Sequence, residues 1–292
     1  MIVGPTASGK TDLALRLGND LPLALISADS MQVYRGMDIG TAKPPSEQRK
    51  QFALIDFVEP GNQYSAGQFA RDATRCCEEA WNRGQVPCLV GGSGLYLRSL
   101  LQGTTDLPPI PSEIRAQVEA MPTNLRIERL MQCDPESAAK IELRNPRRVS
   151  RALEVFLSTG RGLLSWQRDS TRNALVLDQR LGFCLDPKSE ELRDRIRMRN
   201  KIAMQDGWLD ETRHLAEQYG ADQIRATGAI GYSELLDVAE GRLTLEEAEE
   251  RIEIRTWQYA RRQRTWFRSE AGLLWNSDFE EIEKAVHQFI KG

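Results

Sequence analysis

Eight residues near the start of the chain form a pattern that binds phosphate. They read Gly4-Pro5-Thr6-Ala7-Ser8-Gly9-Lys10-Thr11 and match the Gly-x-x-x-x-Gly-Lys-Ser/Thr loop. In such a loop backbone N–H groups surround phosphate oxygens, the lysine neutralises them, and the Thr11 hydroxyl can bind Mg²⁺. A helix expected over residues 12–17 would direct its positive end at the same anion. We therefore expect a di- or triphosphate ligand, with Mg²⁺ as the cofactor.

The phosphate loop identifies part of a ligand and not a reaction. A nucleotide kinase, an NTPase and an enzyme that expels pyrophosphate all remain open. Such a loop ordinarily follows a buried strand of about five residues, but only Met1-Ile2-Val3 precede it. We predict that the natural start lies upstream or that this strand is short and weak.

An acidic residue follows the next apolar run. Asp29 comes just past the predicted strand Leu23–Ser27, where open α/β sheets place their ligands. It could hold Mg²⁺ through water, act as a general base, or simply be the N-cap of the next helix. The turn Gly91-Gly92-Ser93-Gly94 follows a second predicted strand, Pro87–Val90. This turn would reach the same sheet edge, with Ser93 able to hydrogen-bond a ligand.

Three segments concentrate basic residues. Residues 255–268 contain arginines and four aromatic side chains but no acid. This composition suits RNA, because basic groups bind phosphates and rings stack on bases, although the aromatics could instead belong to the core. The second segment is Asn145–Arg151, and the third comprises Arg193, Arg195, Arg197, Arg199 and Lys201. Because Arg195 and Arg199 would share one helix face, we expect an anion between them.

The elements that would position these residues are those of an α/β fold. The first hundred residues alternate short apolar runs with helical stretches, which predicts a parallel sheet covered by helices. A further strand is expected at Leu54–Val58. A helix should begin after Ser65, which forms a capping box with Gln68, and end at Gly84.

The middle of the chain has a different texture. A stiff connector, Leu107–Pro111, precedes charged and helical sequence that continues to Thr171 without strand-like runs. We interpret this part as an inserted helical domain over residues 111–179. The P-loop NTPase-like core would then comprise residues 1–110 and 180–292.

Strand character returns after the insertion. We expect a strand at Leu181–Leu185, a helix from near Pro187, a helix that Thr244 and Glu247 open, and a short strand at Leu273–Trp275. The C-terminal part should therefore return to the core.

Composition narrows the class of protein. The hydrophobic content of 40% supports a buried core, and the net charge of -3 means that any nucleic acid must bind at local patches. Five cysteines without a Cys-x-x-Cys pair fit a reducing compartment, and two histidines argue against a histidine triad or metal site. The chain shows no apolar run of membrane length and no leader, so we expect a cytoplasmic protein without a membrane partner.

Several ordered motifs resemble those of the tRNA dimethylallyltransferases, which prenylate the adenosine beside the anticodon. The match runs over nearly the whole chain, and residues 4–11 are similar to that family's own phosphate loop. The other matching motifs are Ser27–Tyr34, Gly36–Pro44, Val90–Tyr96, Arg148–Glu154, Ala229–Tyr232 and Tyr259–Trp266.

The resemblance implies a reaction. A dimethylallyl group would move from dimethylallyl diphosphate to N6 of adenine, with release of pyrophosphate. It assigns catalysis to Asp29, which would accept the amine proton, and to Ser93 and Arg199. The diphosphate would bind residues 4–11 and the metal would bind Thr11. The anticodon stem-loop of tRNA would contact Asp29, Ser30, Met31, Gln32, Arg115, Arg147, Arg148, Val149, Ser150, Arg151, Arg261 and Arg262.

Two departures from the family pattern are visible. Ser93 stands where many relatives have threonine, so the hydroxyl is kept on a less restricted side chain. The zinc-finger tail of eukaryotic relatives is absent, which points to a bacterial-type enzyme, expected to be a monomer.

Three rival functions use some of the same residues. An isopentenyltransferase acting on free adenine nucleotides shares the loop and the prenyl chemistry, but it leaves the insertion and the arginine-rich segment without a role. A small-molecule kinase would need the phosphate loop alone. A non-catalytic RNA-binding protein would need only the arginines.

Overall fold

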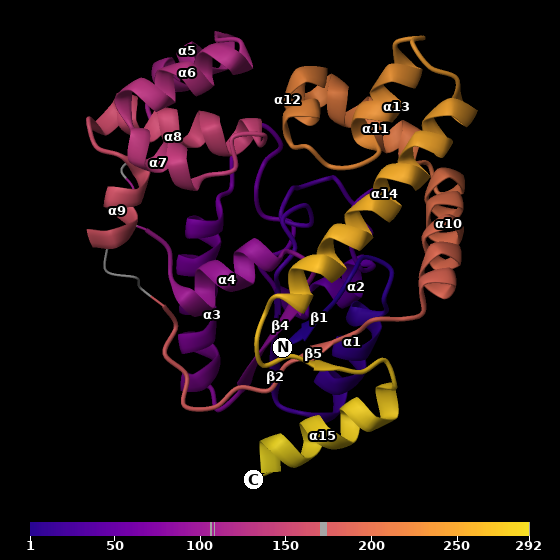
Figure 1. Ribbon diagram of the computed structural model, residues 1–292. Helices are drawn as coiled ribbons and strands as arrows, with labels where there is room; N and C mark the ends of the chain where they lie inside the picture. Colours follow the sequence, from indigo (N-terminus) through magenta and orange to yellow (C-terminus); the bar gives the residue numbers. More distant parts are fainter. Residues whose placement is uncertain (106, 108, 170–173, 292) are drawn as a thin grey trace. The chain divides into compact units, whose positions relative to one another are not determined.

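The computed structural model describes residues 1–105, 107, 109–169 and 174–291, which form two compact units (Figure 1). One unit comprises Met1–Leu101 and Leu175–Gly292, and the other is Gln102–Ala174. The insertion was predicted over residues 111–179. Thr171, where the charged helical sequence was expected to end, and Pro108 of the connector lie outside the described residues.

The first unit contains a six-stranded sheet in the order β3-β2-β4-β1-β5-β6, with every neighbouring pair parallel. This confirms the predicted α/β class. The carboxyl ends of parallel strands meet at one edge, so the segments that follow β1, β2 and β4 can build one site. The strands are β1 (Ile2–Val3), β2 (Leu23–Ser27), β3 (Phe52–Ala53), β4 (Val86–Gly91), β5 (Phe183–Cys184) and β6 (Leu274–Trp275).

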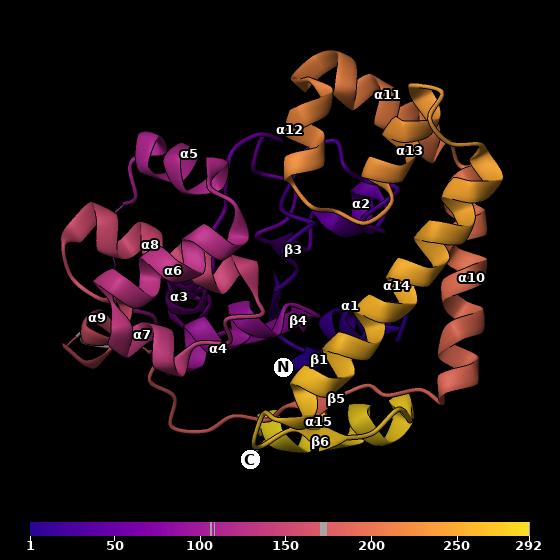
Figure 2. The ribbon, with the colours of Figure 1, turned by 45° about the horizontal axis from the view of Figure 1, so that its top comes forward.

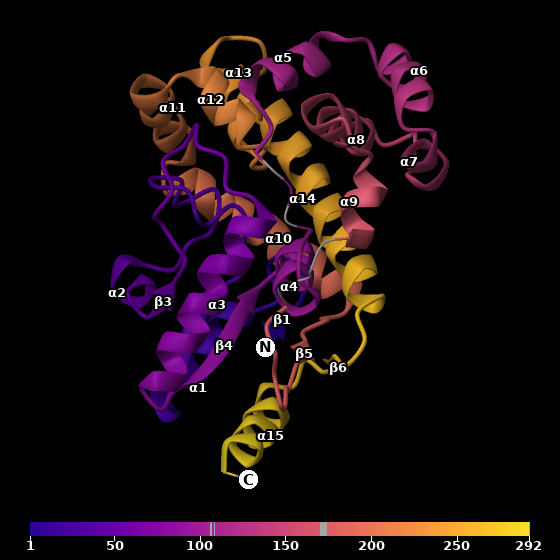
Figure 3. The same ribbon diagram turned by 90° about the vertical axis from the view of Figure 1, so that its left-hand side faces the viewer.

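Side chains alternate between the two faces of this sheet. On one face Ile2, Leu25, Cys88 and Phe183 pack with α1 (Lys10–Asp20) and α15 (Phe279–Lys291). On the other face Val3, Ile26, Leu89 and Cys184 pack with α3 (Ala66–Asn82), α4 (Gly94–Gln102) and the end of α14 (Leu245–Arg268). Figure 3 shows α3 running along β4.

The first strand is short, as expected, yet it occupies the interior of the sheet. β1 has two buried residues that pair with β4 on one side and β5 on the other. The Met1 ammonium donates to the Leu181 carbonyl at 2.7 Å. The phosphate loop therefore depends on neighbouring strands for its support.

The C-terminal part of this unit is helical after β5. α10 (Ser189–Gln205) and α14 lie side by side (Figure 2). A second apolar cluster joins residues 33–37 to the three helices that lie between α10 and α14 in the sequence. These helices are α11 (Trp208–Tyr219), α12 (Ala221–Ala226) and α13 (Tyr232–Ala239), and the short α2 (Ser46–Arg49) precedes β3.

The second unit is a helical domain with its own core. Val118, Leu130, Val149 and Leu153 are fully buried at its centre. It consists of α5 (Ser112–Ala120), α6 (Thr123–Cys133), α7 (Pro135–Lys140), α8 (Pro146–Thr159) and α9 (Leu163–Asp169).

Most predicted elements of the first unit are confirmed. β2 has the predicted bounds, and both capping boxes form. The predicted strand Leu54–Val58 is wrong, because β3 ends at Ala53 and both Leu54 and Asp56 have φ of +59°. That left-handed backbone cannot continue a strand. The predicted strand at Leu181–Leu185 shortens to Phe183–Cys184.

Candidate functional site

The phosphate loop adopts the conformation that its glycines predict. A Cβ at Gly4 would lie 2.4 Å from the Leu185 carbonyl oxygen, and Gly9 has φ of +90° immediately before α1. Both positions therefore require glycine. Lys10 opens the helix, and its ammonium donates to the Pro5 carbonyl at 2.6 Å. The lysine is folded back over the loop, where a phosphate would bind.

Burial sets the charge of Lys10. It lowers the pKa of the ammonium to about 8, with the nearby Asp29 carboxylate opposing the shift and the Arg199 guanidinium adding to it. A bound anion would favour the charged form of this lysine. Binding of a diphosphate would therefore raise the pKa of Lys10 and increase the fraction that is protonated.

A cavity of about 300 Å³ opens at the carboxyl edge of the sheet. It brings together residues that the sequence predicted separately, namely the loop 6–11, Asp29 and Arg199. Gln32, which was predicted as a tRNA contact, also lines it. The rest of its wall was not predicted and includes Thr41, Ala42, Pro44, Pro45, Gln48, Phe52 and Gln263.

Asp29 both caps a turn and faces the cavity. Its Oδ1 accepts the Met31 N–H at 2.9 Å and the Gln32 N–H at 3.4 Å. The helix N-cap considered for Asp29 is wrong, because a turn and not a helix follows it, and the capping of that turn uses one oxygen. The carboxylate also lines the cavity beside the phosphate loop. One side chain can therefore hold the loop and serve a ligand.

Ser93 supports the loop that carries Asp29. Its hydroxyl is almost fully buried, accepts the Ser30 N–H at 2.9 Å and donates to the Ser30 hydroxyl at 3.1 Å. The direct ligand contact expected of Ser93 stays a prediction. What the geometry adds is a connection between the β4 turn and the residue next to Asp29.

Arg199 reaches the phosphate loop from α10. Its Nη1 donates to the Thr6 hydroxyl at 2.5 Å, and burial lowers the pKa of its guanidinium. The expected anion between Arg195 and Arg199 needs correction, because Arg195 forms an ion pair with Glu191 at 2.5 Å. That acid stands one turn earlier on the same helix face, so like charge does not force an anion there. Arg199 alone of the pair lines the cavity.

Gln263 is a site residue that the sequence did not reveal. Its side chain is buried on α14, where Oε1 accepts the Thr6 N–H at 2.8 Å and Nε2 donates to the Gly92 carbonyl at 3.0 Å. The segment was singled out for its arginines and aromatic residues, and nothing in the sequence distinguished the uncharged amide of Gln263. Only the fold shows that it joins the phosphate loop to the turn after β4.

Tyr259 lies one helical turn before Gln263. Burial, followed by the negative charge of Asp29, raises the pKa of its phenol, and hydrogen bonds to Ser93 and Gln263 partly oppose this. Tyr259 therefore remains neutral at physiological pH and can only donate or accept a hydrogen bond.

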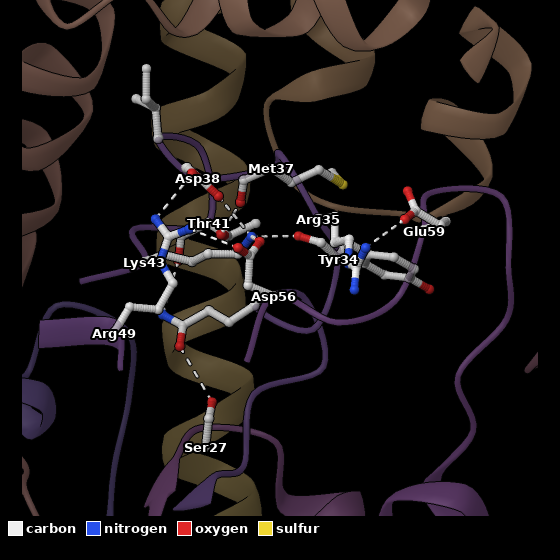
Figure 4. Close-up of polar contacts among 12 residues, drawn as sticks. Ser27, Tyr34, Arg35, Met37, Asp38, Thr41, Lys43, Arg49, Asp56 and Glu59 are labelled. Atoms are coloured by element: carbon white, nitrogen blue, oxygen red, sulfur yellow. Dashed lines mark hydrogen bonds and ion pairs between the residues drawn. The ribbon is translucent and has the colours of Figure 1, made fainter. Parts of the chain in front are cut away.

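A charged cluster holds the cavity wall (Figure 4). The Lys43 side chain is inaccessible to solvent and binds the Tyr34 carbonyl, Asp38 at 2.7 Å and Asp56. Arg49 bridges the same two carboxylates at 3.0 and 2.9 Å. Partial burial would raise the pKa of Asp56, but Lys43 and Arg49 together lower it. The cluster of Lys43, Arg49, Asp38 and Asp56 fixes the segment that leads to Thr41 and Ala42.

Two further side chains hold this segment. Gln32 Nε2 donates to the Ala42 carbonyl at 3.1 Å. The Glu211 carboxylate accepts the N–H groups of Asp38 and Ile39 at 2.9 and 2.8 Å, and the Tyr232 hydroxyl at 2.7 Å. The wall of the cavity is thereby tied to α11 and α13.

The arginine-rich part of α14 divides into packing and exposed residues. The aromatic rings pack, as the alternative interpretation held. Phe267 is buried, and Trp257 packs against Leu192 and Ile196 of α10. Arg264 pairs with Asp186 at 2.5 Å. Arg261 and Arg262 are exposed and remain the predicted tRNA contacts of this helix.

The other predicted tRNA contacts fall into two groups. Asp29, Ser30, Met31 and Gln32 form one turn at the cavity. Arg115 and residues 147–151 belong to the second unit.

Within that second unit the predicted contacts are unequal. Arg147 and Arg148 are exposed at the start of α8, while the Ser150 hydroxyl accepts a hydrogen bond from Arg126 at 3.0 Å. The prediction for Val149 is wrong for its side chain, which is fully buried in the helical core. An apolar residue within a basic motif is placed there by the 3.6-residue period of the helix.

The residues present fit a magnesium ion that a diphosphate carries. Mg²⁺ prefers oxygen ligands and is commonly held by a hydroxyl or carboxylate together with substrate phosphates. Thr11 and Asp29 supply such oxygens to the cavity. Among the described residues no group of three histidine, cysteine or acidic side chains could hold a metal without a substrate. None of the helices described is long and apolar enough to span a membrane.

Comparison with known families finds two matching models. The model of "IPP transferase" matches residues 32–270, and that of "Isopentenyl transferase" matches residues 1–55. The chain is 38% identical to tRNA dimethylallyltransferase 2 of Hahella chejuensis, covering 98% of this chain and 93% of that protein. It is 39% identical to tRNA dimethylallyltransferase of a Synechococcus species, covering 98% and 95%.

Solved structures show the same fold. The tRNA isopentenylpyrophosphate transferase of Bacillus halodurans superposes with a TM-score of 0.70 at 36% identity, covering 100% of this chain and 94% of that one. A eukaryotic dimethylallyltransferase acting on tRNA gives a TM-score of 0.79 at 27% identity, covering 99% and 76%. These neighbours share the P-loop NTPase-like core that the sequence predicted.

Proposed function

Because this chain belongs to the IPP transferase family, we propose that it transfers a dimethylallyl group from dimethylallyl diphosphate to N6 of the adenosine 3′ of the tRNA anticodon, releasing pyrophosphate. The observation that carries this proposal is the cavity that joins a phosphate loop to Asp29. A kinase would also need a phosphate loop, but its relatives would then be named for phosphoryl transfer.

Asp29 would act as the general base. The exocyclic amine of adenine is a poor nucleophile because its lone pair is delocalised into the ring. A carboxylate oxygen that accepts the amine proton as the N6–C1 bond forms removes that limitation. Oδ1 is already bound to the Met31 N–H, so we assign the proton to Oδ2.

The phosphate loop would bind the leaving group. Breaking the allylic C1–O bond leaves its electron pair on pyrophosphate, and the loop N–H groups, Lys10 and Arg199 face that charge. Magnesium held by the Thr11 hydroxyl would supply additional positive charge to the same oxygens. No phosphoryl group is transferred, so the loop serves a departing anion.

Two conditions follow from the chemistry. The allyl carbon develops cationic character, so water must be kept out while tRNA covers the cavity. The target adenine must also leave its base stack to reach Asp29. The exposed Arg261 and Arg262 would hold the RNA backbone near this helix.

A transfer assay tests the proposal. Labelled dimethylallyl diphosphate and Mg²⁺ are incubated with the protein and either tRNA or AMP. We expect label in tRNA and none in AMP. Label that enters AMP and never tRNA would overturn the proposal in favour of an enzyme acting on free nucleotides.

A further inference from the structure

Two loops of the site lie far apart in the sequence. The phosphate loop follows β1, and the turn at residues 91–94 follows β4. Gln263 of α14 contacts both, although it stands 257 positions after Thr6 and 171 positions after Gly92 in the sequence. One amide therefore spans the gap between the segments that would hold donor and acceptor.

Thr6 is held on two sides. Its N–H donates to Gln263 Oε1 at 2.8 Å, while its hydroxyl accepts Arg199 Nη1 at 2.5 Å. The Thr6 N–H already has an acceptor and is therefore not available to a phosphate oxygen. These two contacts fix the position of Thr6 in the phosphate loop, and the position of this loop determines where the diphosphate would bind.

The other end of the Gln263 amide leads to Asp29. Gly92 precedes Ser93, whose hydroxyl accepts the Ser30 N–H at 2.9 Å, and Ser30 follows Asp29. The approach at Gly92 is close, because a Cβ there would lie 2.0 Å from Gln263 Nε2. The absence of a side chain at Gly92 is what admits the glutamine.

We propose that Gln263 is a positioning residue that sets the separation between the allylic C1 of the donor and the Asp29 carboxylate. This inference rests on the proposed transfer reaction. Gln263 touches neither reacting atom; it acts through Thr6 on the diphosphate and through Gly92 and Ser93 on the base. Its buried amide satisfies both contacts at once, which a carboxylate or an aliphatic side chain cannot do.

The expected effect falls on the chemical step. A misplacement of about 1 Å between reacting groups costs on the order of a hundredfold in rate, while each substrate can still bind its own loop. The proposal therefore predicts a split between rate and affinity. A residue that served only folding would lower the unfolding midpoint and both affinities together.

The test compares three variants of the full chain. Gln263→Met removes the contacts to Thr6 and Gly92, and the one to Tyr259, at similar volume. Gln263→Glu keeps the acceptor for Thr6 but loses the donor to Gly92, and Gln258→Met makes the same change at an exposed position of the same helix. Single-turnover transfer to tRNA should fall about ten- to a hundredfold in both Gln263 variants. Dissociation constants for magnesium pyrophosphate and for tRNA should change less than about threefold, and Gln258→Met should match the wild type.

A second measurement keeps the inference independent of the reaction. Amide hydrogen exchange in residues 4–8 and 27–32 should quicken in Gln263→Met and stay unchanged in Gln258→Met. Wild-type rates in either Gln263 variant, unchanged exchange, or a loss of pyrophosphate affinity equal to the loss of rate would overturn the proposal. A wild-type protein that modifies no tRNA would instead refute the proposed function, and the exchange result would still decide whether Gln263 couples the two loops.

Discussion

Asp29 can use one carboxylate oxygen to cap a turn and the other to accept a proton. In Asp29 the capping oxygen is identified by its contact with the Met31 N–H. The two tasks can therefore be separated by a change that keeps one oxygen and removes the basicity.

Asp29→Asn makes that change. The asparagine oxygen still accepts from Met31, but it cannot take a proton from adenine, so transfer should slow about 10²- to 10⁴-fold. Single-turnover assays with labelled donor measure this rate, and filter binding should show tRNA affinity nearly unchanged. A rate within tenfold of the wild type would mean that Asp29 serves only the turn.

The lowered pKa of Lys10 predicts that diphosphate binding is linked to proton uptake. Its pKa is lowered to about 8 by burial, and a bound diphosphate raises it again by favouring the charged ammonium. Pyrophosphate affinity should therefore fall as the pH rises through 8, and binding above that pH should take up a proton.

Calorimetry in two buffers of different ionisation enthalpy measures this uptake at about pH 8.5, where the free lysine is largely neutral. Lys10→Arg is the matched control because arginine stays charged in proteins. Equal proton uptake by the variant and the wild type would assign the linkage to the ligand and not to Lys10.

At the scale of residues the sequence predicted those whose role follows from local spacing. Lys10, Thr11 and Asp29 were found because each stands at a fixed distance from a strand or helix end. Gln263 and Lys43 were missed because their partners are set by tertiary contact, and an isolated polar side chain has no periodicity to indicate it.

Among the elements, the segment between β2 and β3 shows how polar contacts can replace regular structure. Residues 36–45 contain no helix or strand, yet Lys43, Arg49 and Glu211 fix their backbone. The strand expected at Leu54–Val58 failed for the same reason, since Asp56 takes a left-handed backbone while its carboxylate binds Lys43 and Arg49. An apolar run predicted an extended backbone, and the ion cluster around the buried Lys43 replaced it with a bend.

Lys43→Met tests the strength of that cluster. Removing the buried cation leaves two carboxylates facing one arginine, so the free energy of unfolding should fall by about 3 kcal/mol. Urea titration measures this loss. Lys50→Met is the control, because Lys50 pairs with Glu47 at 2.9 Å on the exposed side of α2. That change should cost less than about 1 kcal/mol, and an equal cost for both variants would contradict a special role for Lys43.

The whole molecule carries a net charge of -3 and still has to bind a polyanion. Local patches must do so, and exposed arginines occur in both units, at Arg261 and Arg262 in one and Arg147 and Arg148 in the other. The change of texture at the connector Leu107–Pro111 predicted an inserted helical domain. The pairing of Arg264 with Asp186 was not predictable, because it depends on contact between distant segments. Glu191, by contrast, stands four residues before Arg195, and its pairing could have been found from that spacing.

Arg262→Ala should weaken tRNA binding and make its salt dependence shallower by about one unit of slope, as expected for one lost phosphate contact. Filter binding across a salt series measures the slope. Arg83→Ala is the control, since Arg83 pairs with Glu79 and precedes the start of β4, away from the strand ends that carry the site. An unchanged slope for Arg262→Ala would assign that arginine to its contact with the Tyr259 ring.

The link from Gln263 to Thr6 also bears on synthesis of the chain. The phosphate loop precedes α10 and α14 in the chain, but Thr6 is held by Arg199 of α10 and Gln263 of α14, and β1 pairs with β5 at Phe183–Cys184. Contacts of such sequence separation form late. A nascent chain therefore presents the phosphate-binding residues long before it has a phosphate-binding site, and a diphosphate can be captured only once α14 has been made and has packed against the loop.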